Sequence, residues 1–345
     1  MCKSALKGLI CVFTFVVVWS ALAAAVPNPQ SGKEISREGW VPTIDVVEIN
    51  DHILAFYDGR DISSDPPLAD TYVNWVYWGA MDLGVCTYAV YQGDTALVYD
   101  TMPTIEQAAW IRKYLEDKGV RKFTVVLSHW HKDHIAGNEV YKDSDIIAVG
   151  KTRQTMLEVK DKLEDGTQAG PPAINPVILP NILFDDSLDV YVGDILVELH
   201  HFDIHSPDGN LIYLPDDKIL FSGDTLEDTV TYVTNPEDFP THIAEMKRLR
   251  GMDFERIYPN HGSLDKIKNG GYGKTFIDST INYISKLVAH SKDKDFLKAN
   301  ADLKTFIKDD LDKGWVIYFS AYDEVHASNL QKVHDYYKDK ALPKL

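Results

Sequence analysis

Residues 128–138 read Ser-His-Trp-His-Lys-Asp-His-Ile-Ala-Gly-Asn, which places three histidines and one aspartate within six positions. These four residues are His129, His131, Asp133 and His134. Each imidazole or carboxylate can give a lone pair to a divalent cation. The stretch follows directly on the apolar residues 123–127, which are typical of a buried strand. The pattern therefore predicts a metal site on the loop that leaves this strand.

A chain that leaves a strand presents alternate residues to one side, so His129 and His131 are placed to hold one ion. Asp133 and His134 would then face a second ion. Imidazole and carboxylate ligands together favour zinc, followed by iron or manganese. The alternative is a polar surface loop with unrelated histidines, which an isolated His-x-His would leave open. The full six-residue constellation argues against that alternative.

The stretch resembles the signature of the metallo-β-lactamase superfamily, His-x-His-x-Asp-His, which is followed downstream by a His, an Asp and another His. Three later segments of the chain fit these positions. They are His205 in His-Ser-Pro-Asp-Gly-Asn, Asp224 in Leu-Phe-Ser-Gly-Asp-Thr and His261 in Ile-Tyr-Pro-Asn-His-Gly. Asn260 stands where the family usually has glycine, and asparagine tolerates the left-handed backbone conformation better than most residues.

The resemblance implies a centre for two ions, expected to be zinc, with iron or manganese as further candidates. By this likeness the ligands of the first ion are His129, His131 and His205, those of the second are Asp133, His134 and His261, and Asp224 bridges them. A shared carboxylate lets two cations lie a few ångströms apart. Such a centre lowers the pKa of bound water toward ~7. Asp133 is the expected catalytic residue, since it can orient the hydroxide and take its proton.

The implied activity is that of a zinc-dependent hydrolase. A metal-bridging hydroxide would cleave an ester, lactone, thioester or related bond of a small molecule. The residues around Asp224 argue against two subfamilies. Common zinc β-lactamases have Cys at this position and Lys three residues later, where this chain has Glu227. Acyl-homoserine lactonases tend to have Tyr at the latter position.

Two other functions stay open. The first is β-lactamase activity, as a minor or main function. The second is an oxidoreductase similar to persulfide dioxygenases, which share the His-x-His-x-Asp-His run but use one iron held by two His and one Asp. A catalytically silent binding protein with this fold would have lost one or more ligands, whereas all seven are present here.

The order of apolar runs predicts a chain that mixes strands and helices. Strands are expected at residues 44–48, 52–57, 87–91, 96–99, 123–127, 146–149, 188–192, 195–202, 211–214 and 219–221. Helices are expected at residues 105–117, 152–163, 241–249 and 275–290, with 300–340 mainly helical. This order is compatible with two sheets packed between helices. The resemblance, which covers about residues 44–265, implies the α/β (α+β) four-layer αβ/βα sandwich with the metals at one rim.

The chain of 345 residues, 45% of them apolar, is long enough for one catalytic domain with appendages. Residues 1–25 are predicted to be a signal peptide, with a basic start, an apolar core and small residues at its end. Residues 26–42 are predicted to be a spacer, 43–270 the metallo-β-lactamase-like domain, and 271–345 a C-terminal helical extension packed on that domain. A secreted or periplasmic protein is expected, and an uncleaved membrane anchor is the alternative.

The net charge of −17 at pH 7 argues against a nucleic-acid partner, because nucleases of this type need basic grooves for phosphates. Loss of Lys3 and Lys7 with the signal would make the charge about −19. A small-molecule substrate is expected, with no membrane partner after signal cleavage. Of three cysteines, only Cys86 would remain, which excludes an internal disulfide. The oligomeric state is not indicated.

Four residues outside the ligand set are candidates for substrate binding: Trp75, Tyr77, Trp78 and His326. The three aromatics lie in a long excursion at 58–83, which in relatives often forms a flap over the metals. Strand-like alternation would put Trp75 and Tyr77 on one face and Trp78 on the other. The alternative for all three is a place in the core.

His326 shares a predicted helix face with Tyr322 and Asn329. That face would either contact substrate or pack the helix on the domain. Asp100 matches a position that in the family usually supports the metal loop from behind. The alternative is that Asp100 is an ordinary aspartate at a strand end.

Overall fold

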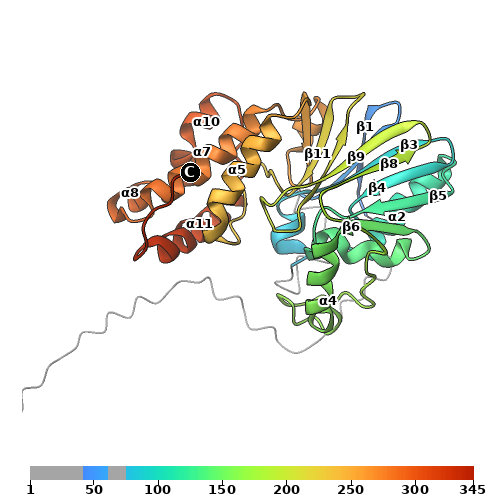
Figure 1. Cartoon of the computed structure of the whole chain (residues 1–345), viewed down its shortest axis with the longest axis horizontal. Coiled ribbons are helices and arrows are strands. Elements are labelled where there is room, and N and C mark those ends of the chain that lie inside the picture. Colours follow the sequence, from blue (N-terminus) through green and yellow to red (C-terminus); the bar gives the residue numbers. More distant parts are fainter. Residues whose placement is uncertain (1–41, 61–74) are drawn as a thin grey trace, which may run out of the picture. The chain divides into compact units, whose positions relative to one another are not determined.

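The computed structural model describes residues 42–60 and 75–345 (Figure 1). The predicted signal peptide at 1–25 and the predicted spacer up to residue 41 lie outside the described residues, as do residues 61–74 of the predicted flap and the side chain of Trp78. Among the residues described, no helix combines the length and apolar character needed to span a bilayer.

The first sheet has seven strands within the described residues, and they lie side by side in sequence order. They are β1 (Asp45–Asn50), β2 (Ile53–Asp58), β3 (Val85–Gln92), β4 (Thr95–Tyr99), β5 (Lys122–Val126), β6 (Asp145–Val149) and β7 (Ile182–Phe184). Strands β1 to β4 pair antiparallel. Strands β4 to β7 pair parallel, and helices connect β4 to β5 and β5 to β6.

The second sheet has five strands in the order β12-β11-β10-β9-β8 in the described part of the chain. They are β8 (Ser187–Val192), β9 (Ile195–His201), β10 (Asn210–Leu214), β11 (Ile219–Gly223) and β12 (Arg256–Pro259). β11 and β12 pair parallel, whereas β8, β9, β10 and β11 pair antiparallel in turn. As a result β9, β11 and β12 all run in one direction, and their carboxyl ends meet at one rim of the sheet.

The central strands β2, β10 and β11 are buried on both faces, because one face of each sheet packs on the other sheet and the opposite face packs on helices. In β2, Ile53, Ala55 and Tyr57 belong to the core between the two sheets, whereas Leu54 and Phe56 belong to the core beneath the helices of the first sheet. All five are buried. Such strands appear in the sequence as nearly continuous hydrophobic runs rather than as an alternation.

Aromatic rings fill the space between the sheets near the rim. Phe221 of β11 is fully buried and stacks on Tyr88 of β3, with ring centroids 4.5 Å apart and planes at 12°. Tyr99 and Tyr258 flank the same ring at 6.1 and 6.4 Å. This stack joins the two sheets beside the strand ends that carry the candidate ligands.

Helices cover the outer faces and complete four layers. α2 (Ile105–Asp117) and α4 (Gly150–Glu164) pack on the first sheet. α5 (Phe239–Arg250), α7 (Thr275–His290) and α11 (Tyr322–Tyr337) pack on the second, and Figure 1 shows these three together on one side. The predicted extension at 271–345 therefore shares a core with the second sheet.

Shorter helical segments fill the connections. They are η2 (Tyr77–Met81), α3 (Lys132–Ile135), η3 (Ala136–Tyr141), η4 (Pro236–Asp238), α6 (Leu264–Lys268), α8 (Lys294–Ala299), α9 (Leu303–Phe306) and α10 (Lys308–Asp312). α2 begins where predicted, because the hydroxyl of Thr104 accepts from the backbone N–H of Gln107 and caps its first turn.

The predicted α/β (α+β) sandwich is confirmed, with three local corrections. The short strands β7 and β12 were not predicted, since runs of three and four residues leave little periodic signal. The strand-like alternation of Trp75, Tyr77 and Trp78 is wrong, because Tyr77–Met81 forms one wide helical turn. Gly79, at φ +98°, gives that turn a backbone conformation that few other residues adopt.

Replacement of Phe221 by alanine should lower the free energy of unfolding by about 3–5 kcal/mol, because a fully buried ring leaves a cavity between the sheets. Urea denaturation measures this loss. Tyr191→Ala is the control, since Tyr191 on β8 is 64% exposed and should change stability by no more than about 0.5 kcal/mol. Equal effects of the two substitutions would contradict the assigned core.

Candidate metal centre

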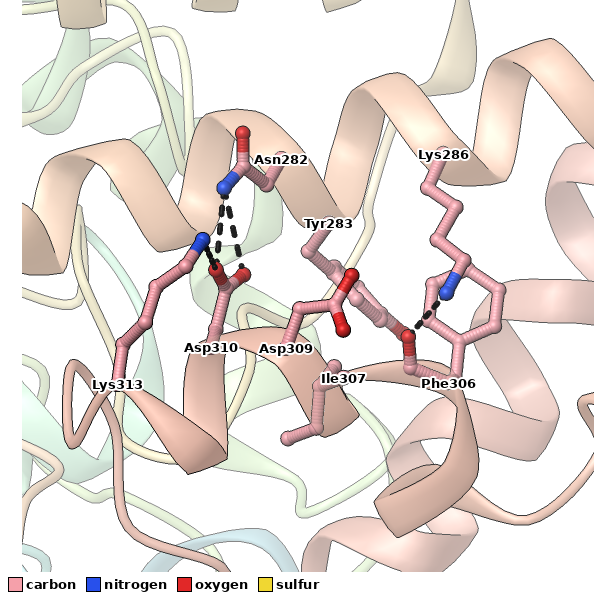
Figure 2. Close-up of a pocket in the computed structure, with 8 residues that line it drawn as sticks. All are labelled: Asn282, Tyr283, Lys286, Phe306, Ile307, Asp309, Asp310 and Lys313. Atoms are coloured by element: carbon pink, nitrogen blue, oxygen red, sulfur yellow. Dashed lines mark hydrogen bonds and ion pairs between the residues drawn. The ribbon is translucent and has the colours of Figure 1, made fainter.

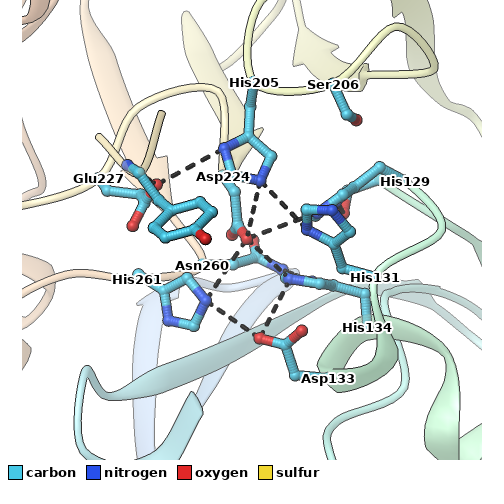
Figure 3. Close-up of polar contacts among 12 residues, drawn as sticks. His129, His131, Asp133, His134, His205, Ser206, Asp224, Glu227, Asn260 and His261 are labelled. Atoms are coloured by element: carbon cyan, nitrogen blue, oxygen red, sulfur yellow. Dashed lines mark hydrogen bonds and ion pairs between the residues drawn. The ribbon is translucent and has the colours of Figure 1, made fainter. Parts of the chain in front are cut away.

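The candidate ligands lie where strands of both sheets end. His129, His131, Asp133 and His134 follow β5. His205 follows β9, Asp224 follows β11 and His261 follows β12, and these three strands run in the same direction. Figure 3 shows the side chains of these residues pointing toward a common centre. The rim of the sandwich therefore collects residues that are up to 132 positions apart in the sequence.

The chain after β5 and the end of β11 lie in close contact, which brings the candidate ligands of the two sheets together. Gly223, directly before Asp224, has φ +54°, and a Cβ atom there would lie 2.8 Å from the Cβ of Ser128. Ser128 in turn precedes His129. A glycine is therefore required at this contact on two grounds, its backbone conformation and the space available.

The first ligand group is His129, His131, His205 and Asp224, whose ligand atoms all lie within 4.8 Å of one another. His205 Nε2 is 3.2 Å from His131 Nδ1. Asp224 Oδ2 lies 3.6 Å from His129 Nε2 and 3.9 Å from His205 Nε2. The structure thus brings together the three histidines predicted for one ion, with the predicted bridging aspartate beside them.

The second group is Asp133, His134, Asp224 and His261, again within 4.8 Å. Asp224 Oδ2 lies 2.9 Å from His134 Nε2 and 3.4 Å from His261 Nε2. Asp133 Oδ2 lies 3.1 Å from His261 Nε2 and 3.4 Å from His134 Nε2. Asp224 belongs to both groups, which is the position predicted for the bridging ligand.

The residues fit a pair of cations. His129 Nε2 and Asp224 Oδ1 are buried atoms without a hydrogen-bond partner among the described residues. An unpaired buried polar atom costs about 1–3 kcal/mol. Two imidazole nitrogens also face one another at 3.2 Å, which requires either a proton or a cation between them. Divalent ions would satisfy all of these lone pairs at once.

Asp100 supports the metal loop from behind, as the family resemblance implied. Its Oδ1 accepts from the backbone N–H of Ser128 at 2.6 Å, and its Oδ2 accepts from His134 Nδ1 at 2.9 Å and from Asn260 Nδ2 at 2.6 Å. Because Asp100 holds one proton of His134 on Nδ1, its Nε2 faces the centre and offers a lone pair there when the ring is neutral. Asp100 itself has φ +66°, a conformation that aspartate adopts more readily than most residues.

Other acceptors orient the remaining rings. His261 Nδ1 donates to the carbonyl of Gly84 at 2.7 Å, which turns Nε2 toward Asp133. His129 Nδ1 lies 2.9 Å from the Ser128 hydroxyl. Such outer contacts fix the ring orientation and the tautomer of a metal-ligating histidine.

Asp208 is a supporting residue that the sequence did not single out. Its Oδ2 accepts from the backbone N–H of Trp130 at 3.0 Å, and its Oδ1 accepts from the Ser206 hydroxyl at 2.7 Å. It ties the loop after β5 to the loop after β9 and so sets the spacing of the first ligand group. The only signal was its place in the Ser-Pro-Asp-Gly turn, which is typical of loops in general.

The two ligand groups differ in the direction in which the pKa values of their histidines are shifted. Burial lowers the pKa of His134 and His261, but neighbouring carboxylates outweigh it and hold both values well above the usual range. For His134 these carboxylates are Asp133, Asp224 and Asp100. Burial and then the adjacent imidazoles hold the pKa of His129 well below the usual range. Protons therefore collect on the second group and are excluded from His129.

Glu227, three residues after Asp224, is also buried at the centre. Its Oε1 lies 3.6 Å from His205 Nδ1 (Figure 3). Burial and then the charge of Asp224 raise the pKa of Glu227 to about 8. Positive charge bound by Asp224 would lower that pKa again. The sequence showed Glu227 as a departure from relatives but gave no sign of its contact with a ligand.

A groove of about 250 Å³ opens beside the centre. Its lining includes Trp75, Trp130, His131, Lys132, Asp133 and Gln168. Trp75 donates from Nε1 to the carbonyl of Pro172 at 2.9 Å, and Lys132 lies 4.5 Å from the Trp75 ring centroid. Burial lowers the pKa of Lys132 to about 7. Two candidate ligands, His131 and Asp133, are therefore accessible from an aromatic groove.

The other candidates for substrate contact lie elsewhere. Tyr77 is buried and packs with Val76 and Met81 rather than lining this groove. His326 is fully buried, with Nδ1 3.0 Å from the Tyr283 hydroxyl and Nε2 3.1 Å from the Asn300 carbonyl. For His326 the structure supports the packing interpretation.

The sequence model of the metallo-β-lactamase superfamily matches residues 81–261, just over half of the chain. The described structure is also similar to a metallo-β-lactamase from Pontibacter korlensis, with a TM-score of 0.52 and 18% identity over 70% of this chain and 99% of that one. At this identity the likeness concerns the fold alone.

Three curated relatives match by sequence. A β-lactamase-like protein 2 homolog of Caenorhabditis elegans is 21% identical, over 70% of this chain and 76% of the relative. Thioesterase pkgB of Emericella nidulans is 29% identical, over 62% and 54%. A linear primary-alkylsulfatase of a Pseudomonas strain is 25% identical, over 48% and 39%. The match thus spans only about half or less of the last two proteins.

Metal binding at pH 7 should release protons, because the pKa values of His134 and His261 are held well above the usual ~6.5. These rings must lose their protons to become ligands. The number released should fall as the pH rises through the raised values. Calorimetric titration of chelator-treated protein with Zn²⁺, in two buffers of different ionisation enthalpy, counts the protons. Heats that do not depend on the buffer at pH 7 would contradict the assigned protonation.

Asp100→Asn should weaken zinc binding about 10- to 100-fold, because the amide cannot serve the three donors that the carboxylate accepts from. Competition with a chromophoric chelator measures the affinity. Asp94→Asn is the matched control, since Asp94 lies in an exposed turn and pairs with Lys122 at the surface. An unchanged zinc affinity of Asp100→Asn would contradict the supporting role assigned to Asp100.

Proposed function

Because this chain belongs to the metallo-β-lactamase superfamily, we propose that it is a hydrolase that holds two zinc ions and cleaves an ester-type bond of a small molecule. The observation that carries the proposal is the division of the seven candidate ligands into two groups that share Asp224. Both groups contain the nitrogen and oxygen donors that zinc accepts.

The completeness of the second group favours two ions over one. Asp133, His134 and His261 approach Asp224 and one another as closely as the ligands of the first group do. A persulfide dioxygenase-like oxidoreductase would hold one iron on two His and one Asp. It would use only part of the seven-residue set, whereas the structure assembles both groups around Asp224. The hydrolase is therefore the better supported of the two functions.

When bound, divalent cations at such a site acidify water toward ~7 and polarise the bond to be cleaved. Asp133 lies at the groove, with its Oδ2 3.1 Å from His261 Nε2. We assign to its Oδ1 the proton that attacking water loses, and the return of that proton to the leaving oxygen or sulfur. The products are then a carboxylic acid and an alcohol or thiol.

The surroundings of the candidate ligands support this substrate class. Carboxylic esters, lactones and thioesters fit an aromatic groove whose walls include Trp75 and Trp130. Two relatives bear the names of a thioesterase and an alkylsulfatase, and both names denote cleavage of ester-type bonds. Antibiotic hydrolysis is less well supported, because buried Glu227 stands where common zinc β-lactamases have a lysine for the substrate carboxylate.

Metal quantification of protein purified without added metal, combined with a substrate panel, tests the proposal. The panel contains a lactone, an aryl ester, a thioester, an alkyl sulfate and a cephalosporin. About two zinc ions per chain and turnover of an ester, lactone or thioester are expected. One iron per chain, with oxygen consumption in the presence of a persulfide, would overturn the hydrolase in favour of the oxidoreductase.

Asp133→Asn should lower kcat about 10²- to 10⁴-fold on the best panel substrate, because the amide cannot take the proton of water. It should also reduce zinc bound by the second group, since one ligand charge is lost. Asp117→Asn is the control, because Asp117 lies at an exposed helix end and pairs with Lys113. If Asp133→Asn left both turnover and metal content unchanged, the role assigned to Asp133 would be wrong.

A further inference from the structure

Residues 227–234 approach His205 at two points, its backbone carbonyl and its ring. The Thr234 hydroxyl donates to the His205 carbonyl at 3.0 Å. Glu227 Oε1 lies 3.6 Å from His205 Nδ1, and this buried nitrogen has no hydrogen-bond partner among the described residues. His205 therefore differs from His134 and His261, whose Nδ1 atoms have close acceptors. Glu227 is the acceptor that faces its unpaired nitrogen.

Glu227 is itself held in place by neighbours. The backbone N–H of Tyr232 donates to its Oε1 at 2.9 Å, which fixes that oxygen on the side of His205. The hydroxyl of Tyr322, on α11, lies 3.5 Å from its Oε2. Both Glu227 and Tyr322 are buried. The carboxylate thus has a defined orientation between the ligand loop and the C-terminal helix.

The same helix anchors the rest of the segment. Asn329 Nδ2 donates to the Thr231 carbonyl at 2.8 Å, and Asn329 Oδ1 accepts from the backbone N–H of Val233 at 2.9 Å. The Tyr283 hydroxyl on α7 accepts a further bond from Asn329 Nδ2 at 3.0 Å. These helices lie outside residues 81–261, the part that matches the superfamily. One amide therefore fixes the backbone between Glu227 and Thr234.

A neutral imidazole carries one proton, and the nitrogen nearer to an acceptor keeps it. We propose that Glu227 is a positioning residue that keeps the proton of His205 on Nδ1, so that the Nε2 lone pair faces His131 and Asp224. We further assign to α11, through Asn329 and Tyr322, the task of holding Glu227 there. The C-terminal extension then belongs to the metal centre, and this inference rests on the proposed two-metal function.

Three variants test the proposal by competition titration of chelator-treated protein with Zn²⁺. Glu227→Met removes the acceptor and should weaken one of the two zinc sites about 10- to 100-fold. Glu227→Gln keeps an amide oxygen of similar reach and should lose less affinity. Asn329→Ala should weaken the same site, because it releases the backbone on either side of Thr231.

Asn282→Ala is the matched control. Asn282 lies on α7 in the same extension, but its amide bonds Asp310 at 3.1 Å in a separate pocket, as Figure 2 shows. Its loss should leave both zinc affinities unchanged. If Glu227 and Asn329 contributed packing alone, their variants would lower the melting temperature while both zinc affinities stayed at the wild-type values, and the proposal would be overturned.

The ¹⁵N shifts of the His205 ring give a readout that does not depend on metal. In wild type and in Glu227→Gln they should show a proton on Nδ1, and in Glu227→Met a mixture of tautomers. If wild type bound no zinc, the two-metal function would fail, yet these shifts would still decide the role of Glu227. Identical shifts in wild type and Glu227→Met would overturn that role even where two zinc ions bind.

Discussion

The buried carboxylate of Asp224 is the group on which the centre depends. Its Oδ2 lies between 2.9 and 3.9 Å from ring nitrogens of His134, His261, His129 and His205. A carboxylate in this position is stable only with positive charge around it, supplied by protons or by cations. Strands of both sheets end at one rim, and this arrangement places the four histidines around the Asp224 carboxylate. Bound ions would then link the two halves of the sandwich and stabilise the folded chain by mass action.

The sequence predicted what is local or strongly patterned. The candidate ligands His129, His131, Asp133 and His134 fall within six consecutive positions, and long apolar runs marked most strands. The fold and the candidate ligand set could therefore be predicted by likeness. The roles of Glu227 and Asp208 could not, because they arise from tertiary proximity. Glu227 lies 22 positions from His205 and 95 positions from Tyr322. Helical spacing did place Tyr322, His326 and Asn329 on one face, but spacing cannot reveal what that face packs against.

The polar face of α11 shows how a buried network gives specificity to a packed helix. Tyr322, His326 and Asn329 each find a partner on α7, on the segment after Asp224, or on the Asn300 carbonyl. A purely apolar face would allow the helix to slide or rotate with little penalty, whereas each of these contacts fixes one orientation. These contacts therefore fix the orientation of α11. They also fix the position of the segment after Asp224 that α11 contacts.

The contact at Gly223 has a consequence for the spacing of the candidate ligands. The distance between the ligands of the two sheets is set there by backbone against side chain, at a point where a Cβ would lie 2.8 Å from Ser128. A side chain at position 223 would therefore push the loops after β5 and β11 apart and widen the spacing between the two sets of candidate ligands.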